Sequence, residues 1–400
     1  RVQPPDGNHL EESGGDGGMR YTIGQLAEII DGDRGKNYPK QDEFYPQGYC
    51  LFLNTGNVTK EGFIFEENQF IMKEKDEALR KGKLKRGDIV YTTRGTVGNA
   101  GYYNSSVPYE NVRINSGMVI LRSNGEIVDA RFLYQILKSE YYRPYFKQYC
   151  TGSAQPQLPI KNFSQIYLNV PDIKTQHRIA DILSVYDNLI ENNQKQIKLL
   201  EEAAQRLYKE WFVDLRFPGH ENTKIVDGVP EGWSRGLLKE LISVNYGKDH
   251  KKAPDDGNIP VYGSGGLMRK CNKSLFSGEA VLIPRKGSLN NIMYVDETFW
   301  TVDTMFYATM KQPHTAVFVY FFVKAFDMYS MNIGAAVPSM TAKILDAMDV
   351  VIPDKETLEK FDKLTKTYFN KIKTLQGQNE RLKIARDLLL AKLMSGEVEV

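Results

Sequence analysis

The sequence has few cysteines, and none of them suggests a disulfide framework or a zinc site. Cys50, Cys150 and Cys271 lie far apart, and no two of them form a CxxC pair. Scattered cysteines in an odd number are typical of proteins that work in a reducing compartment. Long apolar runs are also lacking, because the longest, from Ala316 to Val323, is far below the roughly 20 residues that cross a bilayer. With no secretory signal visible, we expect a cytoplasmic protein.

Motifs of nucleotide-dependent and hydrolytic enzymes are missing as well. The sequence has no GxxxxGK[ST] loop, no strand-linked GxGxxG and no GxSxG, the patterns that hold phosphates, dinucleotides and a serine nucleophile. Its five histidines show neither HxH nor HxxxH spacing, so a metal cluster is not expected. We therefore predict no catalytic residue, no metal and no cofactor, and expect a chain that is not itself an enzyme.

An excess of charge of one sign is absent too, since 52 Lys and Arg residues face 50 Asp and Glu residues. Bulk charge therefore says little about partners. The 400 residues, 41% of them hydrophobic, are enough for two or three domains with cores of their own. The segment Arg1–Gly18, rich in glycine and nearly devoid of apolar residues, is interpreted as a tag or a disordered segment and set aside.

What the sequence does contain is an internal repeat. The stretch from Gly152 to Thr175 matches the stretch from Gly334 to Thr357 at seven positions, at a constant offset of 182 and without gaps. Upstream, a Gly-acid-strand pattern leads in both copies to a basic turn, Arg94-Gly95-Thr96 in the first and Arg285-Lys286-Gly287-Ser288 in the second. Several matches in the same order indicate that the chain is built from two related halves.

A long helix is predicted after each repeated stretch, opening at Pro171-Asp172 and at Pro353-Asp354. Apolar residues then recur at steps of three and four over about 35 residues without an internal proline, which is typical of a coiled-coil seam. In the first helix we place Ile182 and Leu189 among the seam residues, interrupted by Asn193 in one helix and Asn379 in the other. Because each helix leaves its own globular unit, we expect the two to pair antiparallel. Two surface helices on separate domains are the alternative.

The fold class predicted from these patterns is α+β, with a curved β-sheet plus helices in each globular unit, two long antiparallel coiled-coil helices and a pseudo-two-fold repeat. The expected organisation is a tag or disordered segment at residues 1–18, domains at 19–171 and 228–353, long helices at 172–212 and 354–395, and a linker at 213–227.

Basic residues on the loops of the globular units are candidates for DNA contact. Lys and Arg neutralise phosphates, and Arg and Asn reach base edges. We pair Arg94 with Arg285, because both copies place an arginine at the same turn. For any single lysine a solvated surface is the alternative. The candidate DNA-binding residues are Arg34, Lys36, Lys85, Arg86, Arg94, Thr96 and Asn99 in the first unit and Lys248, Lys251, Lys252, Ser264, Arg285, Lys286 and Asn290 in the second.

With these features in order, the chain resembles the specificity subunit of type I DNA restriction-modification systems. The resemblance is carried by GSAQPQL at 152–158, its partner GAAVPSM at 334–340, VPEGW at 229–233, and the helix ends RLYKEWF and ARDLLLAKLMSGEV. The individual motifs are loose, whereas their order over the whole chain is specific.

The resemblance implies that each globular unit is a target recognition domain that reads one half of a bipartite site in double-stranded DNA. It also implies that the long helices act as a spacer and dock two methyltransferase subunits, and that two restriction and translocase subunits complete the restriction form. Methyl transfer and ATP-driven cleavage would then belong to these partners. No base-contacting residue follows from the resemblance, so the candidate residues rest on charge and turn position.

Two other functions remain open from the sequence. A stand-alone or fused restriction enzyme would need a methylase NPPY-type motif or a metal-binding carboxylate cluster, and neither is visible. A coiled-coil scaffold without a role on DNA would show no sequence-dependent retention of DNA.

Overall fold

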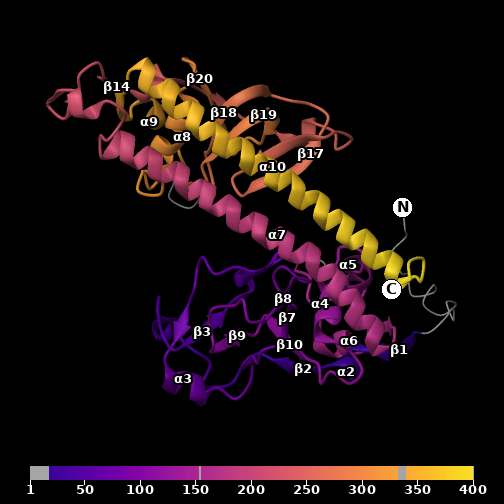
Figure 1. Cartoon of the computed structure of the whole chain (residues 1–400). Helices are drawn as coiled ribbons and strands as arrows, with labels where there is room; N and C mark the ends of the chain where they lie inside the picture. The colour runs from indigo at the N-terminus through magenta and orange to yellow at the C-terminus, as the bar shows by residue number, and fades with distance from the viewer. Residues whose placement is uncertain (1–17, 153–154, 332–338, 400) are drawn as a thin grey trace. The chain divides into compact units, whose positions relative to one another are not determined.

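The computed structural model describes residues 18–152, 155–331 and 339–399, and the chain divides into two compact units (Figure 1). Unit 1 comprises the chain up to Asn192 together with the stretch from Gln378 onward, and unit 2 runs from Asn193 to Gly377. Residues 1–17 of the predicted segment 1–18 lie outside the described residues, as do parts of both repeat motifs, 153–154 and 334–338.

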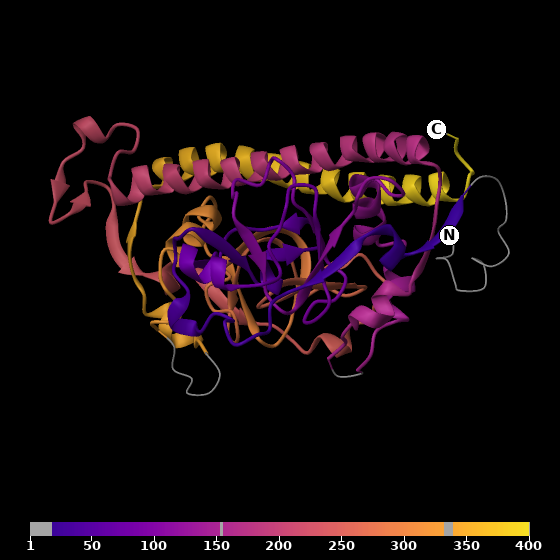
Figure 2. The same cartoon turned by 90° about the horizontal axis from the view of Figure 1, so that it is seen from below.

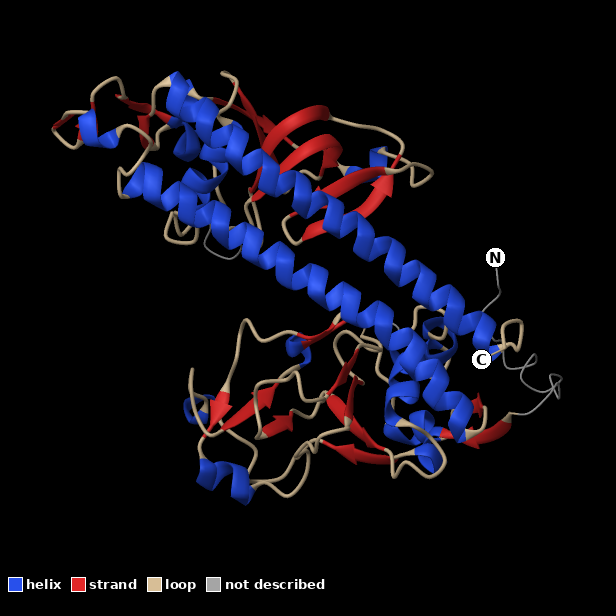
Figure 3. Ribbon diagram, viewed as in Figure 1, coloured by secondary structure: helices blue, strands red, loops and turns tan. Residues whose placement is uncertain are grey.

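Unit 1 is built on short strands joined by long loops (Figure 3). One sheet has the order β2-β10-β7-β8 and a second has the order β6-β3-β9, while β1 pairs with β11 and β4 with β5. The strands are β1 (Met19–Thr22), β2 (Glu28–Asp31), β3 (Cys50–Leu53), β4 (Val58–Thr59), β5 (Gly62–Phe63), β6 (Phe70–Ile71), β7 (Ile89–Thr92), β8 (Ala100–Tyr102), β9 (Val112–Ile114), β10 (Met118–Arg122) and β11 (Tyr167–Val170).

Helices cover one side of this sheet and enclose the larger core of unit 1. Alternate residues of β7 and β10, such as Tyr91 and Val119, pack on Phe132 and Phe163 of the covering helices, and Ile179 and Leu390 of the long helices join the same cluster. Val90 and Ile120 face the opposite way, into a second cluster, as the period of two in a strand requires. The short helices are α2 (Ile23–Leu26), η1 (Gln41–Glu43), η2 (Thr55–Asn57), α3 (Lys73–Ala78), α4 (Ala130–Lys138), α5 (Arg143–Lys147) and α6 (Ile160–Ser164).

Unit 2 has longer strands and one main sheet, with the order β15-β20-β18-β19-β16-β17. Pairs β14–β21 and β12–β13 lie apart from it. The strands are β12 (Ile225–Val226), β13 (Val229–Pro230), β14 (Ser234–Leu237), β15 (Ile242–Tyr246), β16 (Ile259–Gly263), β17 (Gly266–Cys271), β18 (Phe276–Pro284), β19 (Met293–Thr301), β20 (Met305–Met310) and β21 (Asp349–Ile352).

An aromatic core holds unit 2 together. Phe318 and Phe321 from α8 (Ala316–Lys324) pack with Tyr208, Trp211 and Phe361 of the helical stretches. Ring centroids of Tyr208 and Phe321 lie 5.5 Å apart, a separation at which aromatic pairs attract beyond their area burial. The remaining helices are η3 (Lys209–Val213), η4 (His220–Asn222), η5 (Leu238–Glu240), η6 (His250–Lys252) and α9 (Ala342–Asp346).

The two long helices are α7 (Ile173–Tyr208) and α10 (Lys355–Met394). The aspartates before them cap their first turns in the same way: Thr175 Oγ1 donates to Asp172 at 2.6 Å and Thr357 Oγ1 donates to Asp354 at 2.7 Å. In unit 1 the first turns of α7 lie along the last turns of α10, and in unit 2 the last turns of α7 lie along the first turns of α10 (Figure 2). The predicted antiparallel pairing is confirmed within each unit.

The predicted α+β class and the internal repeat are also confirmed. Strands β2-β10-β7 of unit 1 and β15-β20-β18 of unit 2 follow the same order with the same antiparallel pairings. The predicted seam was wrong in part, since Ile182 and Leu189 are 37% and 47% exposed. Ile179, another predicted seam residue, is buried, and the next buried positions are Leu183 and Ile190, each one residue after an exposed one that was predicted.

Candidate DNA-recognition surface

In unit 1 an exposed turn follows the end of β7, and backbone hydrogen bonds hold its base. The N–H groups of Thr93 and Arg94 both donate to the carbonyl of Gly117, at 2.9 and 3.1 Å. From the other side, the N–H of Leu158 donates to the carbonyl of Thr93 at 2.9 Å. Residues 94–96 are exposed, and Gly95 has a φ of 69°, which glycine adopts without steric cost. The turn is a fixed loop with a free basic tip.

Other basic residues of unit 1 lie at the loops around this turn. Arg34 follows β2, and its Nη2 lies 3.2 Å both from the carbonyl of Ser116, beside Gly117, and from Asp31 Oδ1. Lys36 is exposed two residues further along. Arg80 and Lys81, which are also exposed, are brought close through Asp33, whose Oδ2 accepts from the N–H of Arg80 at 2.8 Å.

Asp33 organises this corner as an anion. A hydrogen bond from the N–H of Gly35, opposed by burial and reinforced by the N–H of Arg80, lowers the pKa of Asp33 below its usual range. Arg34, Lys36, Arg80, Lys81 and Arg94 together give one end of the sheet a positive surface suited to phosphates. Arg80 and Lys81 were missed as candidates because only the fold brings their loop beside the turn.

Lys85 and Arg86 do not join this surface, since they precede β7 and Arg94 follows it. Arg86 is tied to its own loop: its Nη1 donates to the carbonyl of Val107 at 3.0 Å and its guanidinium lies 4.2 Å from the centre of the Tyr103 ring. It stabilises the loop after β8. This argues against a DNA contact for Arg86.

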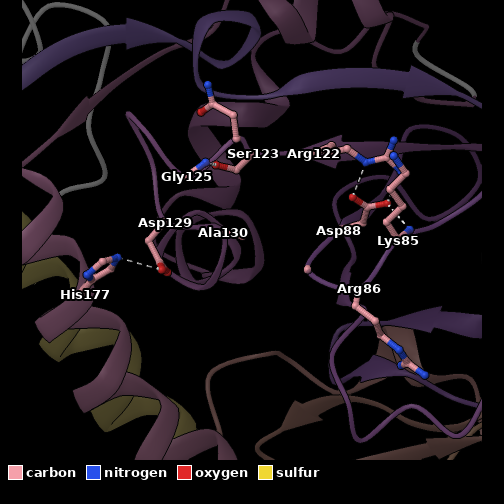
Figure 4. A pocket seen from close by; sticks show the side chains of 11 residues that line it. Lys85, Arg86, Asp88, Arg122, Ser123, Gly125, Asp129, Ala130 and His177 are labelled. Atoms are coloured by element: carbon pink, nitrogen blue, oxygen red, sulfur yellow. Dashed lines mark hydrogen bonds and ion pairs between the residues drawn. The ribbon is translucent and has the colours of Figure 1, made fainter.

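A pocket of about 390 Å³ opens beside these two residues (Figure 4). An ion pair and a histidine–carboxylate contact line it: Arg122 Nη2 lies 2.7 Å from Asp88 Oδ2, and His177 Nε2 lies 3.3 Å from Asp129 Oδ2. Carboxylates thus hold Arg122 and His177, whereas Lys85 and Arg86 line the pocket at the end of β7 opposite to the turn.

Asn99 is also withdrawn from the surface. It is 5% exposed, and its Nδ2 donates to the carbonyl of Val58 at 2.9 Å. From the sequence we expected it at the exposed turn. It lies instead just before β8, where its bond to Val58 holds β4 in place. Thr96, by contrast, is exposed on the turn itself.

Unit 2 carries the same kind of turn after β18. The N–H groups of Arg285 and Lys286 both donate to the carbonyl of Thr304, at 2.8 and 3.2 Å. The N–H of Met340 donates to the carbonyl of Arg285 at 2.9 Å. Lys286 is exposed, as are the next two residues, and Gly287 has a φ of 85°.

The other candidates of unit 2 lie after β15, beside the turn, or on η6. Lys248 follows β15, its N–H donates to the carbonyl of Thr301 at 2.9 Å, and its side chain is exposed. Ser264 abuts the turn, because a Cβ atom added to Gly287 would lie 2.8 Å from its Oγ. Lys251 and Lys252 are exposed on η6.

Asn290 has a structural task instead. Its Nδ2 donates to Asp327 Oδ1 at 3.0 Å, and its Oδ1 accepts from the N–H of Met328 at 2.8 Å. It therefore fixes the segment after α8.

Comparisons with known proteins match this chain to one family. The model of the type I restriction modification DNA specificity domain matches twice, at residues 17–202 and 230–383. The chain belongs to this family.

The specificity subunit has relatives over most of its length. It is 24% identical to the type I restriction enzyme MjaIX specificity subunit of Methanocaldococcus jannaschii, over 81% of each chain. It is also 24% identical to the HindI specificity subunit of Haemophilus influenzae, over 92% of this chain and 98% of that one. The crystal structure of the S subunit from M. genitalium has the same fold, with a TM-score of 0.54, 18% identity, and coverage of 98% and 99% of the two chains.

Membership assigns the chain as the DNA-recognition component of a type I restriction-modification system, a non-catalytic subunit with two specificity domains. Within the described residues of the specificity subunit, no cluster of three or more His, Cys, Asp or Glu side chains could hold a metal ion. No helix among those residues is long and apolar enough to cross a membrane.

Proposed function

We propose that each unit of this subunit reads one half of a bipartite sequence in double-stranded DNA, with its exposed glycine turn directed at the duplex. The repeated turn supports this most directly, because both units present a basic residue, a glycine and a hydroxyl residue on the same backbone frame. Basic side chains hold phosphates and hydroxyl groups bond to either phosphates or bases. We propose the recognition domains at 19–171 and 228–353, the long helices at 172–212 and 354–395, and a linker at 213–227.

Lys36, Arg94 and Thr96 of unit 1 remain in the proposed contact surface, with Arg80 and Lys81 added, while Arg34 borders it with its Nη2 held by Asp31 and the carbonyl of Ser116. Lys248, Lys251, Lys252, Ser264 and Lys286 remain in unit 2. Lys85 is exposed but lies at the other end of β7, and Arg86, Asn99 and Asn290 are occupied by contacts within the fold. These last four are left out, and Arg285, whose Nη1 donates to the carbonyl of Asp303, is not counted among the contacts either.

The partners proposed for the assembly are two methyltransferase subunits, with two restriction and translocase subunits in the restriction form. The long helices offer a docking surface for a methyltransferase in unit 1. Val185 and Leu189 of α7 are 57% and 47% exposed, and Ile384 and Leu388 of α10 are 60% and 50% exposed. Apolar side chains exposed in a group mark interaction sites in soluble proteins.

All three cysteines are free, which agrees with a cytoplasmic assembly.

Charge placed on this surface tests the docking. Leu189→Asp and Leu388→Asp should abolish co-purification of the full chain with its methyltransferase, because a carboxylate would be buried without a partner. Val226→Asp, on the equally exposed β12, is the control and should leave the complex intact. Intact complexes with both helix variants would move the methyltransferase to another surface.

Methylome sequencing tests the function itself. A host that expresses this chain with its methyltransferase subunit should carry methylation at one two-part sequence, with unspecified bases between the parts. Methylation without a shared sequence, or at one uninterrupted sequence, would contradict bipartite recognition.

A further inference from the structure

The strand pairings of the two units decide which residues of the two turns correspond. In unit 1, Thr92 of β7 pairs with Met118 of β10. In unit 2, Pro284 of β18 pairs with Met305 of β20. Since β10 and β20 occupy the same place in their sheets, Thr92 corresponds to Pro284. One residue further on, Thr93 corresponds to Arg285.

Backbone hydrogen bonds give the same register independently. The carbonyl of Gly117 accepts from residues 93 and 94, and the carbonyl of Thr304 accepts from residues 285 and 286. Leu158 and Met340, counterparts in the repeat at the offset of 182, donate to the carbonyls of residues 93 and 285. The glycines with positive φ, Gly95 and Gly287, fall into register as well. Arg94 therefore corresponds to Lys286, and the predicted pairing of Arg94 with Arg285 was off by one residue.

The side chain of Arg285 has another task. Its Nη1 donates to the carbonyl of Asp303 at 3.0 Å, and its guanidinium lies 5.6 Å from the centre of the Tyr246 ring. The corresponding carbonyl in unit 1, that of Ser116, accepts from Arg34. In both units, therefore, an arginine side chain holds the backbone just before the strand next to the turn, β10 in unit 1 and β20 in unit 2. Arg34 does so from the loop after β2, whereas Arg285 belongs to the turn itself.

Lys286 and Arg94 have no such bond. Among the described residues, neither side chain has a hydrogen-bond or ion-pair partner, and both are exposed at the tip beside Thr96 or Ser288. An unengaged cation next to a hydroxyl on a rigid turn can approach a phosphate or a guanine edge without breaking an existing contact.

We propose that Lys286, and not Arg285, is the DNA-contacting counterpart of Arg94, and that Arg285 is a positioning residue which holds the second turn in shape. The inference rests on the proposed function, because it names the contacting residue of each recognition turn. Arg94 contacts one half-site and Lys286 the other.

The experiment uses the full chain assembled with its methyltransferase, and duplexes that carry the methylated sequence found in the host. Binding is measured at low and moderate salt for Arg94→Ala, Lys286→Ala, Arg285→Ala and Lys286→Arg. Each of the first two should weaken binding about tenfold, with discrimination relaxed in one half-site only. Lys286→Arg, which keeps the positive charge, should bind DNA as tightly as the wild-type chain does.

A second readout separates positioning from contact. All three tryptophans, at positions 211, 233 and 300, belong to unit 2, so their fluorescence follows the unfolding of that unit. Arg285→Ala should lower the unfolding temperature of unit 2 and weaken binding less than Lys286→Ala does, whereas Lys286→Ala should leave unfolding unchanged. The inference is overturned if Arg285→Ala weakens binding more than Lys286→Ala without a change in unfolding, or if Lys286→Ala has no effect on binding. A wild-type complex that does not distinguish its target from other duplexes would instead refute the proposed function.

Discussion

At the scale of single residues, a buried group of charges fastens the sheet domain of unit 1 to its helices. Asp187 of α7 lies 2.5 Å from Lys138 Nζ of α4 and 2.8 Å from Arg386 Nη1 of α10. Gln135 Nε2 also donates to Asp187, at 2.6 Å. Burial works against the carboxylate, but the two cations outweigh it and lower the pKa of Asp187. Asp187 is therefore the counter-charge of the buried Lys138, and it shares Arg386 with Asp387, which lies 3.0 Å from Arg386 Nη2.

Asp187→Asn should destabilise unit 1 by about 3 kcal/mol, because Lys138 would remain buried without its carboxylate partner, while Arg386 would keep only Asp387, 3.0 Å from its Nη2. Chemical unfolding followed by circular dichroism measures this loss, while tryptophan fluorescence should show unit 2 unchanged. Asp181→Asn is the matched control: Asp181 pairs with Arg131 at 2.6 Å but is 65% exposed, and exposed pairs contribute about 0–1 kcal/mol. Equal losses of unfolding free energy for the two variants would show that burying these charges adds no stability to unit 1.

The cap of α10 predicts a dependence on pH. Burial would raise the pKa of Asp354, but hydrogen bonds from Thr357 and from Trp233 Nε1, the latter 2.9 Å long, lower it overall. A carboxylate with a lowered folded pKa stabilises above its unfolded pKa of about 3.9, and this stability is lost as the pH falls through the folded value.

Asp354→Ala should therefore cost unit 2 about 1 kcal/mol at pH 7. The difference from the wild-type chain should begin to shrink below about pH 4, where the unfolded carboxyl becomes protonated, and should shrink further as the pH falls through the lower folded pKa. Tryptophan fluorescence during urea unfolding measures it. A difference that stayed constant from pH 7 to pH 3 would show that the cap does not act through its charge.

The candidate residues show how far residue-level prediction reaches. Charge and glycine patterns were sufficient to find the turns at Arg94 and Lys286. They could not assign the register, because the sequence places two basic residues side by side at positions 285 and 286 and only strand pairing separates them. They also could not show that Arg86, Asn99 and Asn290 are occupied, since their partners at Val107, Val58 and Asp327 lie far away in sequence.

At the scale of elements, the long helices were predictable from periodicity and caps, while the stripe that packs inward was not. Ile182 and Leu189 follow the same three-and-four spacing as Ile179, Leu183 and Ile190, and all are apolar. Periodicity cannot tell a stripe that packs on a domain from one left exposed for a partner. Leu189, which was wrongly predicted to pack inward, thus lies on the surface proposed for methyltransferase docking.

Helix α10 contains one glycine, Gly377, in its 40 residues. A Cβ atom added there would meet nothing within 4 Å, so packing does not require glycine. Gly377→Ala should stabilise the chain by about 0.5–1 kcal/mol, because glycine disfavours a helix interior by that amount. Gln376→Ala, at the exposed neighbouring position, should change stability only slightly. Thermal unfolding of both variants tests this, and a destabilised Gly377→Ala chain would indicate that the glycine serves a contact or bend needed in the folded helix.

At the scale of the whole molecule, the chain is two copies of one plan with different chemistry. Both copies share the order of three sheet strands, the aspartate cap of the long helix, and the hydrogen bond between the repeat loop and the basic turn. Both also have a glycine with a positive φ in that turn. The offset of 182 made the duplication visible in the sequence. Each unit also has an antiparallel pair, β3–β6 in unit 1 and β16–β17 in unit 2, whose first strand adds in parallel to β9 or to β19. These strands lie outside the repeated sequence motifs, and the sequence therefore could not predict them.

Exchange of one domain tests the central claim most directly. Residues 19–171 are replaced by the corresponding domain of a relative with a different target, and the methylome of a host expressing the chimera with its methyltransferase is sequenced. Because each unit has its own core and its own turn, one half of the methylated sequence should change and the other should stay as in the wild type. A chimera that folds and methylates but changes both halves, or neither, would contradict the account.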